Sequence, residues 1–471
     1  MELAPEKSGT PNGPSSDEDR SRLGPVIFAS SLGTLFEWYD FYLYGSLAVF
    51  FGGLFFPKGN ETAQLLASLA TFGAGFGVRP LGAVVFGHIG DLIGRKYTFL
   101  VTMATMGLST AIIGVLPTYE TAGILATLLL VLSRLLQGLA LGGEYGGAAT
   151  YVAEHVPDDK RGFYTSFIQT TATLGFFLSM GVIGTTRILL GEESFKQSGW
   201  RIPFLLSFVL LGVSLYIRIK MKESPLFAKL KSEGKSSVNP LKESFTNPVN
   251  LRYVLLALFG ATAGQGVVWY TGQFYALTFL QSALKVPWKT AYVLVSTSLA
   301  LTTPLFVLFG WLSDRIGRKK LMMTGCLLAA LTYVPIYMAM RHYSNPNGLP
   351  VADPAQINSV MLVLLLSIQM VYVCMVYGPI AAFLVELFPT KIRYTSMSIP
   401  YHLGNGWFGG FLPLIATAVT ASAWSKQTFG SGSMYTGLLY PIAVCVLTLI
   451  VGSLYIHETK DHKIDADLHM K

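Results

Sequence analysis

Long apolar stretches alternate with short polar connections along almost the whole chain. A stretch of about 20 apolar residues is long enough to cross a bilayer as a helix. Such stretches lie at 25–51, 63–88, 97–116, 123–153, 163–184, 201–219, 252–280, 290–312, 320–340, 358–387, 396–421 and 434–456. The two-residue alternation of an outer-membrane strand does not occur in them. The pattern therefore predicts an all-α membrane protein with twelve transmembrane helices, six in each half of the chain.

Two short signatures occur once in each half. GHIGDLIGRK at 87–96 follows the second stretch, and GWLSDRIGRK at 310–319 follows the eighth, 223 residues later. EHVPDDKR at 154–161 and ELFPTKIR at 386–393 form a second pair at a similar offset. Internal duplication of apolar halves is typical of membrane transporters, so we expect two six-helix bundles.

The duplication also predicts the domain boundaries. The expected parts are a disordered cytoplasmic tail at 1–24, an N-terminal six-helix bundle at 25–219, a cytoplasmic linker at 220–250, a C-terminal six-helix bundle at 251–456 and a second cytoplasmic tail at 457–471.

The amino-acid composition and the distribution of charge agree with a protein embedded in a lipid bilayer. Hydrophobic residues make up 52% of the chain, charged residues only 13%, and the mean hydropathy is +0.50, whereas soluble domains carry about 25% charged residues. The net charge of +8 could suggest nucleic acid, but Lys and Arg concentrate in the two tails and in alternate connections. That distribution predicts a multi-pass protein of the bacterial inner membrane with both termini in the cytoplasm and no nucleic-acid partner.

Three carboxylates lie inside predicted membrane helices. Glu37 and Asp40 are three residues apart, so they share one side of the first helix, and Glu144 lies in the fourth. An ionised carboxylate in hydrocarbon costs roughly 2.5–3.5 kcal/mol on insertion scales, so such groups face the protein interior and usually have a function. We expect proton coupling at these positions. The alternative is that they are structural partners of buried arginines.

Two arginines also lie within the first half. Arg79 is in the second stretch and Arg134 in the fourth, and the repeat-related positions hold Thr302 and Leu366. Structural needs should recur with the repeat, so this asymmetry favours function. We expect the arginines to hold a substrate carboxylate. The predicted substrate contacts are Arg79, Arg134, Gln137, Tyr270, Gln273 and Asn405.

The duplicated turns supply a candidate conformational gate. Glycine permits a tight reversal, and the aspartate can cap a helix or pair with an arginine. Such charges can form bridges between the halves that exist in one conformation only. The predicted gate residues are Gly87, Asp91, Gly94, Arg95, Glu154, Arg161, Asp314, Arg315, Gly317, Arg318, Glu386 and Arg393.

The turn signature, present in both halves, resembles that of the major facilitator superfamily, in which it is held to lock the cytoplasmic side. The strings EWYDFYLYG at 37–45, GGEYGG at 142–147, GWRIPF at 199–204 and ESP at 223–225 are similar to those of its metabolite:proton symporter family. That family includes permeases for 2-oxoglutarate, citrate, shikimate and proline or betaine. The first turn carries Leu92 where the family has arginine, so its lock should rely on Asp91 and Arg95.

The resemblance implies a proton-coupled symporter that imports a small organic acid by alternating access. A carrier of a zwitterion such as proline or betaine is an alternative, and a passive uniporter is another. We expect a small molecule and protons as partners, a monomer in the bilayer, and no cofactor or metal. The sequence shows no phosphate-binding loop, metal-ligand cluster or nucleophile–base arrangement, so an enzyme is not expected.

Overall fold

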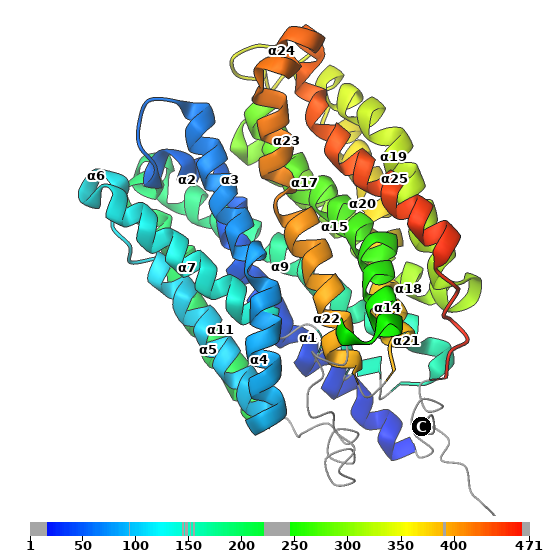
Figure 1. Cartoon of the computed structure of the whole chain (residues 1–471). Coiled ribbons are helices and arrows are strands. Elements are labelled where there is room, and N and C mark those ends of the chain that lie inside the picture. Colours follow the sequence, from blue (N-terminus) through cyan, green and yellow to red (C-terminus); the bar gives the residue numbers. More distant parts are fainter. Residues whose placement is uncertain are drawn as a thin grey trace, which may run out of the picture.

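The structure is a computed structural model that describes residues 17–93, 95–143, 146, 149–150, 152–153, 156–220, 245–389 and 392–463, with side chains left out at 17–30, 87–99, 217–218, 220 and 394. Every regular element in these ranges is a helix, and the helices form two bundles side by side (Figure 1). The all-α prediction is therefore confirmed. Most of the predicted linker at 220–250 and the predicted tail before residue 17 lie outside the described residues.

The first bundle contains the helices up to Lys220. They are α1 (Asp17–Ser46), α2 (Ala48–Phe55), α3 (Glu61–Gly77), α4 (Arg79–Ile93), α5 (Arg95–Ile113), α6 (Tyr119–Ala122), α7 (Ile124–Gly142), η1 (Asp158–Lys160), α9 (Arg161–Leu190), α10 (Glu192–Ser194), η2 (Phe195–Gly199) and α11 (Arg201–Lys220). The helix α1 begins at Asp17, earlier than the predicted start at residue 25.

The second bundle begins at Pro248. Its elements are α14 (Pro248–Ala257), η3 (Leu258–Thr262), α15 (Ala263–Tyr270), η4 (Thr271–Tyr275), α16 (Ala276–Thr278), η5 (Phe279–Ala283), α17 (Trp288–Thr302), α18 (Pro304–Ile316), α19 (Arg318–His342), α20 (Ser359–Tyr377), α21 (Ile380–Leu387), α22 (Arg393–Leu403), η6 (Gly404–Gly410), α23 (Leu412–Ala421), α24 (Ala423–Phe429), η7 (Gly430–Leu438) and α25 (Leu439–Tyr455).

Several predicted stretches are broken helices. The stretch 63–88 is divided at Val78, two residues before Pro80, because proline has no N–H to continue the helical bonds. Stretch 252–280 contains the π-helical turns η3 and η4, and 396–421 contains η6. Within the described residues, eight helical spans are long and apolar enough to cross a membrane, and a ninth is a pair bent by 57°.

Small residues let helices of the first bundle approach closely. A Cβ atom on Gly138 of α7 would overlap the carbonyl of Gly75 on α3, and a Cβ atom on Gly142 would overlap the carbonyl of Arg79. Close glycine contacts of this kind are common between membrane helices. The contact brings the start of α4 against α7, which places Arg79 near Arg134.

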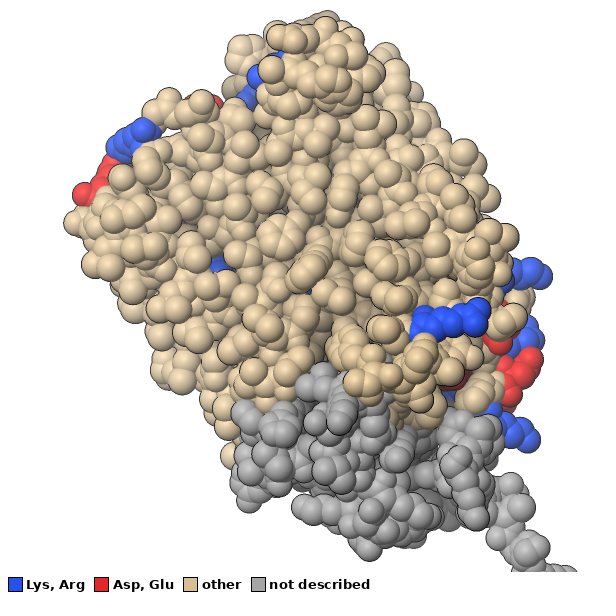
Figure 2. All heavy atoms as spheres, in the orientation of Figure 1, with Lys and Arg blue, Asp and Glu red and all other residues tan. Residues whose placement is uncertain are grey.

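Charged side chains gather toward the two ends of the molecule, and the broad face between them is almost free of charge (Figure 2). Such a belt suits a bilayer, since charged groups in hydrocarbon are costly. Helices of the two bundles meet along α9 and α18, and along α3 and η6. We call the end at which α9 begins and α25 ends the gate end.

Candidate functional site

Arg79 is a completely buried cation at the start of α4. Its guanidinium carbon lies 4.1 Å from the ring centre of Phe76, 4.8 Å from that of Phe41 and 5.0 Å from that of Trp38. Among the described residues, none of its three guanidinium nitrogens has a hydrogen-bond partner. Aromatic faces stabilise the cation only in part, so Arg79 keeps its hydrogen-bonding capacity for another group.

Arg134 also lies against the Phe41 ring, with its guanidinium carbon 4.2 Å from the ring centre. Its Nη1 atom donates to the Phe41 carbonyl at 3.2 Å and to the Gln137 side chain. The Gln137 amide in turn donates to Thr110 Oγ1 at 2.7 Å, which fixes it. The Nε and Nη2 atoms of Arg134 have no partner in the described part of the chain. Two buried cations with open donors therefore contact one ring, which gives the donor groups that an anion site requires.

The second bundle covers these arginines with aromatic side chains. Trp269 stacks on Tyr42 with ring centres 5.3 Å apart, and Tyr270 meets Phe76 edge to face at 5.1 Å. The Nε1 atom of Trp269 has no hydrogen-bond partner among the described residues. The structure thus brings the predicted contact Tyr270 to the arginines, and it adds Tyr42, Phe41 and Phe76, which were not predicted as site residues.

The two predicted amide contacts differ in their surroundings. Gln273 on η4 donates to Thr173 Oγ1 of the first bundle at 3.4 Å, and its Oε1 atom is without a partner in the described ranges. Asn405 forms a reciprocal pair with Gln265, with N···O distances of 2.9 and 3.1 Å. Gln273 therefore keeps an open acceptor between the bundles, whereas Asn405 is already satisfied within its own bundle. Its role as a substrate contact stays a prediction.

The two carboxylates of α1 face different neighbours. By helical spacing, Glu37 lies on the same stripe as Phe41 and Tyr44, the residues whose rings contact Arg134. Asp40 lies beside Ser207 of α11, and no ion pair joins it to a described residue. Both side chains are buried. Glu37 is thus one helical turn from Phe41, whose ring contacts Arg134, whereas Asp40, on the same side of α1, lies nearer α11. Glu144 lies outside the described residues.

The gate end holds a buried network of charges. Arg161, the first residue of α9, donates to Glu386 of α21 with Nη1 and Oε1 2.9 Å apart. Arg318 reaches the same Oε1 atom at 3.1 Å and pairs with Asp314 at 2.6 Å. The side chains of Arg161, Glu386 and Arg318 have no exposed area. Four predicted gate residues therefore form one network that crosses between the bundles.

Asp314 also caps α9 from the other bundle. Its Oδ1 and Oδ2 atoms accept the backbone N–H groups of Gly162 and Phe163, each at 2.8 Å. A carboxylate is favourable at a helix N-terminus because unpaired N–H groups and the helix dipole both attract it. At the same crossing, a Cβ atom on Gly162 or on Gly310 would lie 2.5 Å from the carbonyl oxygen of the other glycine. The gate end is therefore closed.

The segment after α25, residues 456–463, covers this network. Glu458 accepts the backbone N–H groups of Arg318 at 2.8 Å and Lys319 at 3.1 Å, and Thr459 Oγ1 donates to Glu386 Oε2 at 2.7 Å. The carbonyl of His462 accepts from Arg161 at 3.4 Å. Sequence reasoning missed these contacts, because nothing in the spacing relates a polar tail to helix starts about 140 residues away.

The other predicted gate residues lie outside the network or outside the described side chains. Arg315 is exposed and stacks on Trp311, 4.0 Å from its ring centre. Arg393 Nε donates to the Phe388 carbonyl at 3.0 Å, and Gly317 has a positive φ of 108° that suits the turn before α19. The positions that lie outside the described side chains are Gly87, Asp91, Gly94, Arg95 and Glu154.

Contacts also join the bundles at the far end. The Tyr292 hydroxyl of α17 donates to the Ser46 carbonyl of α1 at 2.6 Å. The Arg187 guanidinium of α9 lies 3.8 Å from the ring centre of Trp288. The arginines are thus enclosed between two sets of contacts that link the bundles.

Comparisons with known proteins agree with this architecture. The family model of the Major Facilitator Superfamily matches residues 30–399. The chain is 36% identical to the inner membrane metabolite transport protein YhjE of Escherichia coli (strain K12), covering 93% of this chain and 95% of that protein. It is 32% identical to the shikimate transporter (92% and 94% covered) and 32% identical to the alpha-ketoglutarate permease (94% and 95%) of the same organism.

The same fold occurs in a solved structure. The proton:xylose symporter XylE bound to 6-bromo-6-deoxy-D-glucose matches with a TM-score of 0.74 and 18% sequence identity, over 96% of this chain and 99% of that one. At this identity the likeness shows the fold alone. It agrees with the prediction of two six-helix bundles.

Proposed function

Because the chain belongs to the major facilitator superfamily, whose members are transporters and not enzymes, we propose that it is a proton-coupled symporter that imports a small organic anion. Transport proceeds by alternating access, with the two bundles as the moving parts. The chain works as a monomer in the bacterial inner membrane. Its gate end faces the cytoplasm, in keeping with the basic residues of the tails and alternate connections.

The observation that carries this proposal is the pair of buried cations at the Phe41 ring. Arg79 and Arg134 have open N–H donors and are buried among aromatic rings. An arginine fork matches a carboxylate with two parallel hydrogen bonds, and an anion here would neutralise charge that burial makes costly. Two relatives are named for shikimate and alpha-ketoglutarate, which are carboxylates, and this supports the same substrate class for the chain.

Proton coupling supplies the driving force. An inside-negative potential opposes an entering anion by about 2.3 kcal/mol per charge per 100 mV, and protons that enter with the anion reverse this penalty. Glu37 is the preferred proton carrier, since it lies one helical turn from Phe41, whose ring contacts Arg134. Asp40 and Glu144 are the alternatives.

Binding tests the proposal directly. Purified protein is screened by thermal shift against organic acids, zwitterions and sugars, since a ligand of the native state raises the Tm. We expect an organic acid to stabilise the protein, Arg134→Ala to abolish the shift, and Arg134→Lys to weaken it because an ammonium lacks the two-pronged grip. Arg315→Ala, an exposed arginine outside the site, is the matched control and should keep the full shift.

Uptake into proteoliposomes tests the coupling. Accumulation against a gradient should require an imposed proton gradient, and a protonophore should abolish it. A shift with proline or betaine but with no acid would favour the zwitterion carrier, and uptake that is indifferent to the protonophore would favour a uniporter. A full thermal shift in Arg134→Ala would move the substrate site elsewhere.

A further inference from the structure

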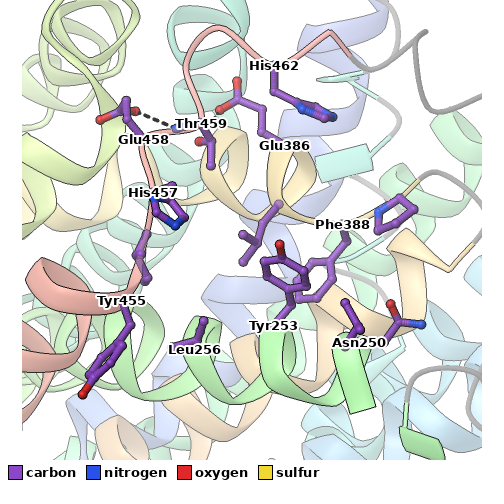
Figure 3. A pocket seen from close by; sticks show the side chains of 14 residues that line it. Asn250, Tyr253, Leu256, Glu386, Phe388, Tyr455, His457, Glu458, Thr459 and His462 are labelled. Carbon is purple, nitrogen blue, oxygen red and sulfur yellow. Dashed lines mark hydrogen bonds between the residues drawn. The ribbon is translucent and has the colours of Figure 1, made fainter. Parts of the chain in front are cut away.

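Two hollows meet where α25 leaves the membrane. The first is a cavity of about 340 Å³ between the start of α14, the end of α21 and the segment 456–463 (Figure 3). The second is a wider groove of about 680 Å³ along α14 and α25. Leu256 and Tyr455 line both hollows. The two hollows therefore adjoin along these side chains, the groove on the outer surface of the bundle and the cavity beside the gate network.

The groove and the cavity differ in chemistry. The groove is lined by apolar side chains from the two helices, namely Leu251, Leu255, Leu256, Phe259, Leu447 and Val451. Its polar groups are the Tyr455 hydroxyl and Arg252, which is exposed at the gate-end part of the groove. The cavity beside it is lined in part by Tyr253 and His457. Two carboxylates also line the cavity, Glu386, whose charge is matched by Arg161 and Arg318, and Glu458, which accepts N–H groups at the start of α19. No described residue forms a hydrogen bond or ion pair with the side chain of Arg252, Tyr253 or His457.

This combination fits an amphiphile with a negative head. Residues 252 to 259 rise about 10 Å along α14 and the start of η3 at about 1.5 Å per residue, roughly a third of the ~30 Å hydrocarbon layer. A lipid chain can follow that length while its head remains at the interface. A guanidinium, a phenol and an imidazole together provide the donors that phosphate oxygens accept. We propose that an anionic phospholipid binds here, with one acyl chain in the groove and its phosphate at Arg252, Tyr253 and His457.

The site is connected to the gate through shared residues. Glu386, Glu458, Thr459 and His462 line the cavity, and the same residues make the contacts that hold segment 456–463 over the gate network. A headgroup in the cavity meets this segment in its docked position. The lipid therefore favours the conformation in which the gate end is closed, and it does so without contact with the substrate site.

Native mass spectrometry of the purified protein tests the lipid site independently of transport. The probes are phosphatidylglycerol, phosphatidylcholine and inorganic phosphate. We expect one retained phosphatidylglycerol, with retention lowered ~10-fold by the double variant Arg252→Ala/His457→Ala and by Leu447→Trp, which fills the groove. The controls are Arg341→Ala, a basic residue of α19 away from the site, and Leu331→Trp, an exposed leucine of the same helix. The Tm without lipid shows that each variant is folded.

Three results would overturn the site. The first is that the double variant retains as much phosphatidylglycerol as the unmodified protein. The second is that the unmodified protein retains phosphatidylcholine as well as it retains phosphatidylglycerol. The third is that inorganic phosphate competes with the lipid and Leu447→Trp does not lower retention, which would indicate a free-anion site.

A second experiment tests the link between the lipid site and the gate. The probe is a cysteine at position 166 in a variant without Cys326, Cys374 and Cys445. Ser166 is buried beneath the crossing of α9 and α18. We expect this cysteine to react more slowly with a maleimide in phosphatidylglycerol than in phosphatidylcholine. Equal rates would refute the coupling.

Discussion

Glu386 and Arg161 pair at 2.9 Å although they come from different copies of one repeated motif. Each copy has a glutamate seven residues before an arginine, and the glutamate of the second copy meets the arginine of the first. The arginine of the second copy, Arg393, donates to the Phe388 carbonyl in its own turn, and the glutamate of the first copy, Glu154, lies outside the described residues. The duplication therefore supplies both partners of a bond between the bundles.

Removing the carboxylate at this pair should open the gate end. Glu386→Gln leaves Arg161 and Arg318 without their shared charge partner, and breaking a buried ion pair costs about 3–5 kcal/mol. We expect faster maleimide labelling of a cysteine at Ser166 and slower substrate turnover, with substrate affinity nearly kept. Glu193→Gln, an exposed carboxylate at the far end, is the control. Unchanged labelling in Glu386→Gln would show that the pair does not hold the closed state.

The glycine crossing gives a steric test of the same interface. Gly162→Ala places a methyl group 2.5 Å from the Gly310 carbonyl oxygen, so the two backbones must separate. Overpacking of this kind typically costs about 1–3 kcal/mol. Gly181→Ala is the matched control on the same helix, because a Cβ atom there meets nothing within 4 Å. We expect slower transport only in the first variant. Equal transport rates in the two variants would contradict a tight crossing.

Neutralising the proton carrier should separate exchange from accumulation. In Glu37→Gln we expect loss of uphill uptake, retained exchange of labelled for unlabelled substrate, and a flattened pH dependence of uptake, because the titrating group is gone. Asp40→Asn should keep its pH dependence, since Asp40 lies against α11 beside Ser207. If only Asp40→Asn is uncoupled, the assignment reverses. If neither is, Glu144 becomes the candidate.

The segment after α25 should stabilise the fold as a helix cap. Glu458→Ala removes the carboxylate that accepts two N–H groups at the start of α19, and loss of a cap costs about 1 kcal/mol. We expect a lower Tm in detergent and faster labelling at Ser166. Asp461→Ala, an exposed acidic residue three positions later, is the control. The same Tm in both variants would argue against a capping role.

The sequence was most informative where apolar length and repetition decide the structure. The helical class follows from the apolar stretches. Arg79 and Arg134 could be singled out because placing a charge within an apolar membrane helix costs free energy. The partners of those charges could not be predicted. That both arginines contact Phe41 depends on the glycine contacts of α7 with α3 and α4. How helices pack cannot be deduced from the residue spacing within any one segment.

For the gate contacts as well, the candidate residues could be predicted from the sequence but their partners could not. The repeated turns identified Asp314, Arg318, Arg161 and Glu386 as candidates. Their cross-pairing, and the cap supplied by Glu458, depend on how the bundles face one another and on where the chain goes after α25. Arg315 was expected to act with them because it belongs to the motif, yet helical geometry points it outward onto Trp311.

The guanidinium of Arg79, which has no hydrogen-bond partner among the described residues, also affects how readily the carrier changes conformation without substrate. Contacts join the bundles at both ends, and the nitrogens of Arg79 have no acceptor among the described residues. Burying a cation in this way costs free energy. A bound anion removes that expense. The carrier should therefore change conformation slowly without substrate and quickly with substrate bound. In a cell that holds abundant substrate, one-for-one exchange across the membrane would be rapid, and the carrier would seldom cycle without substrate.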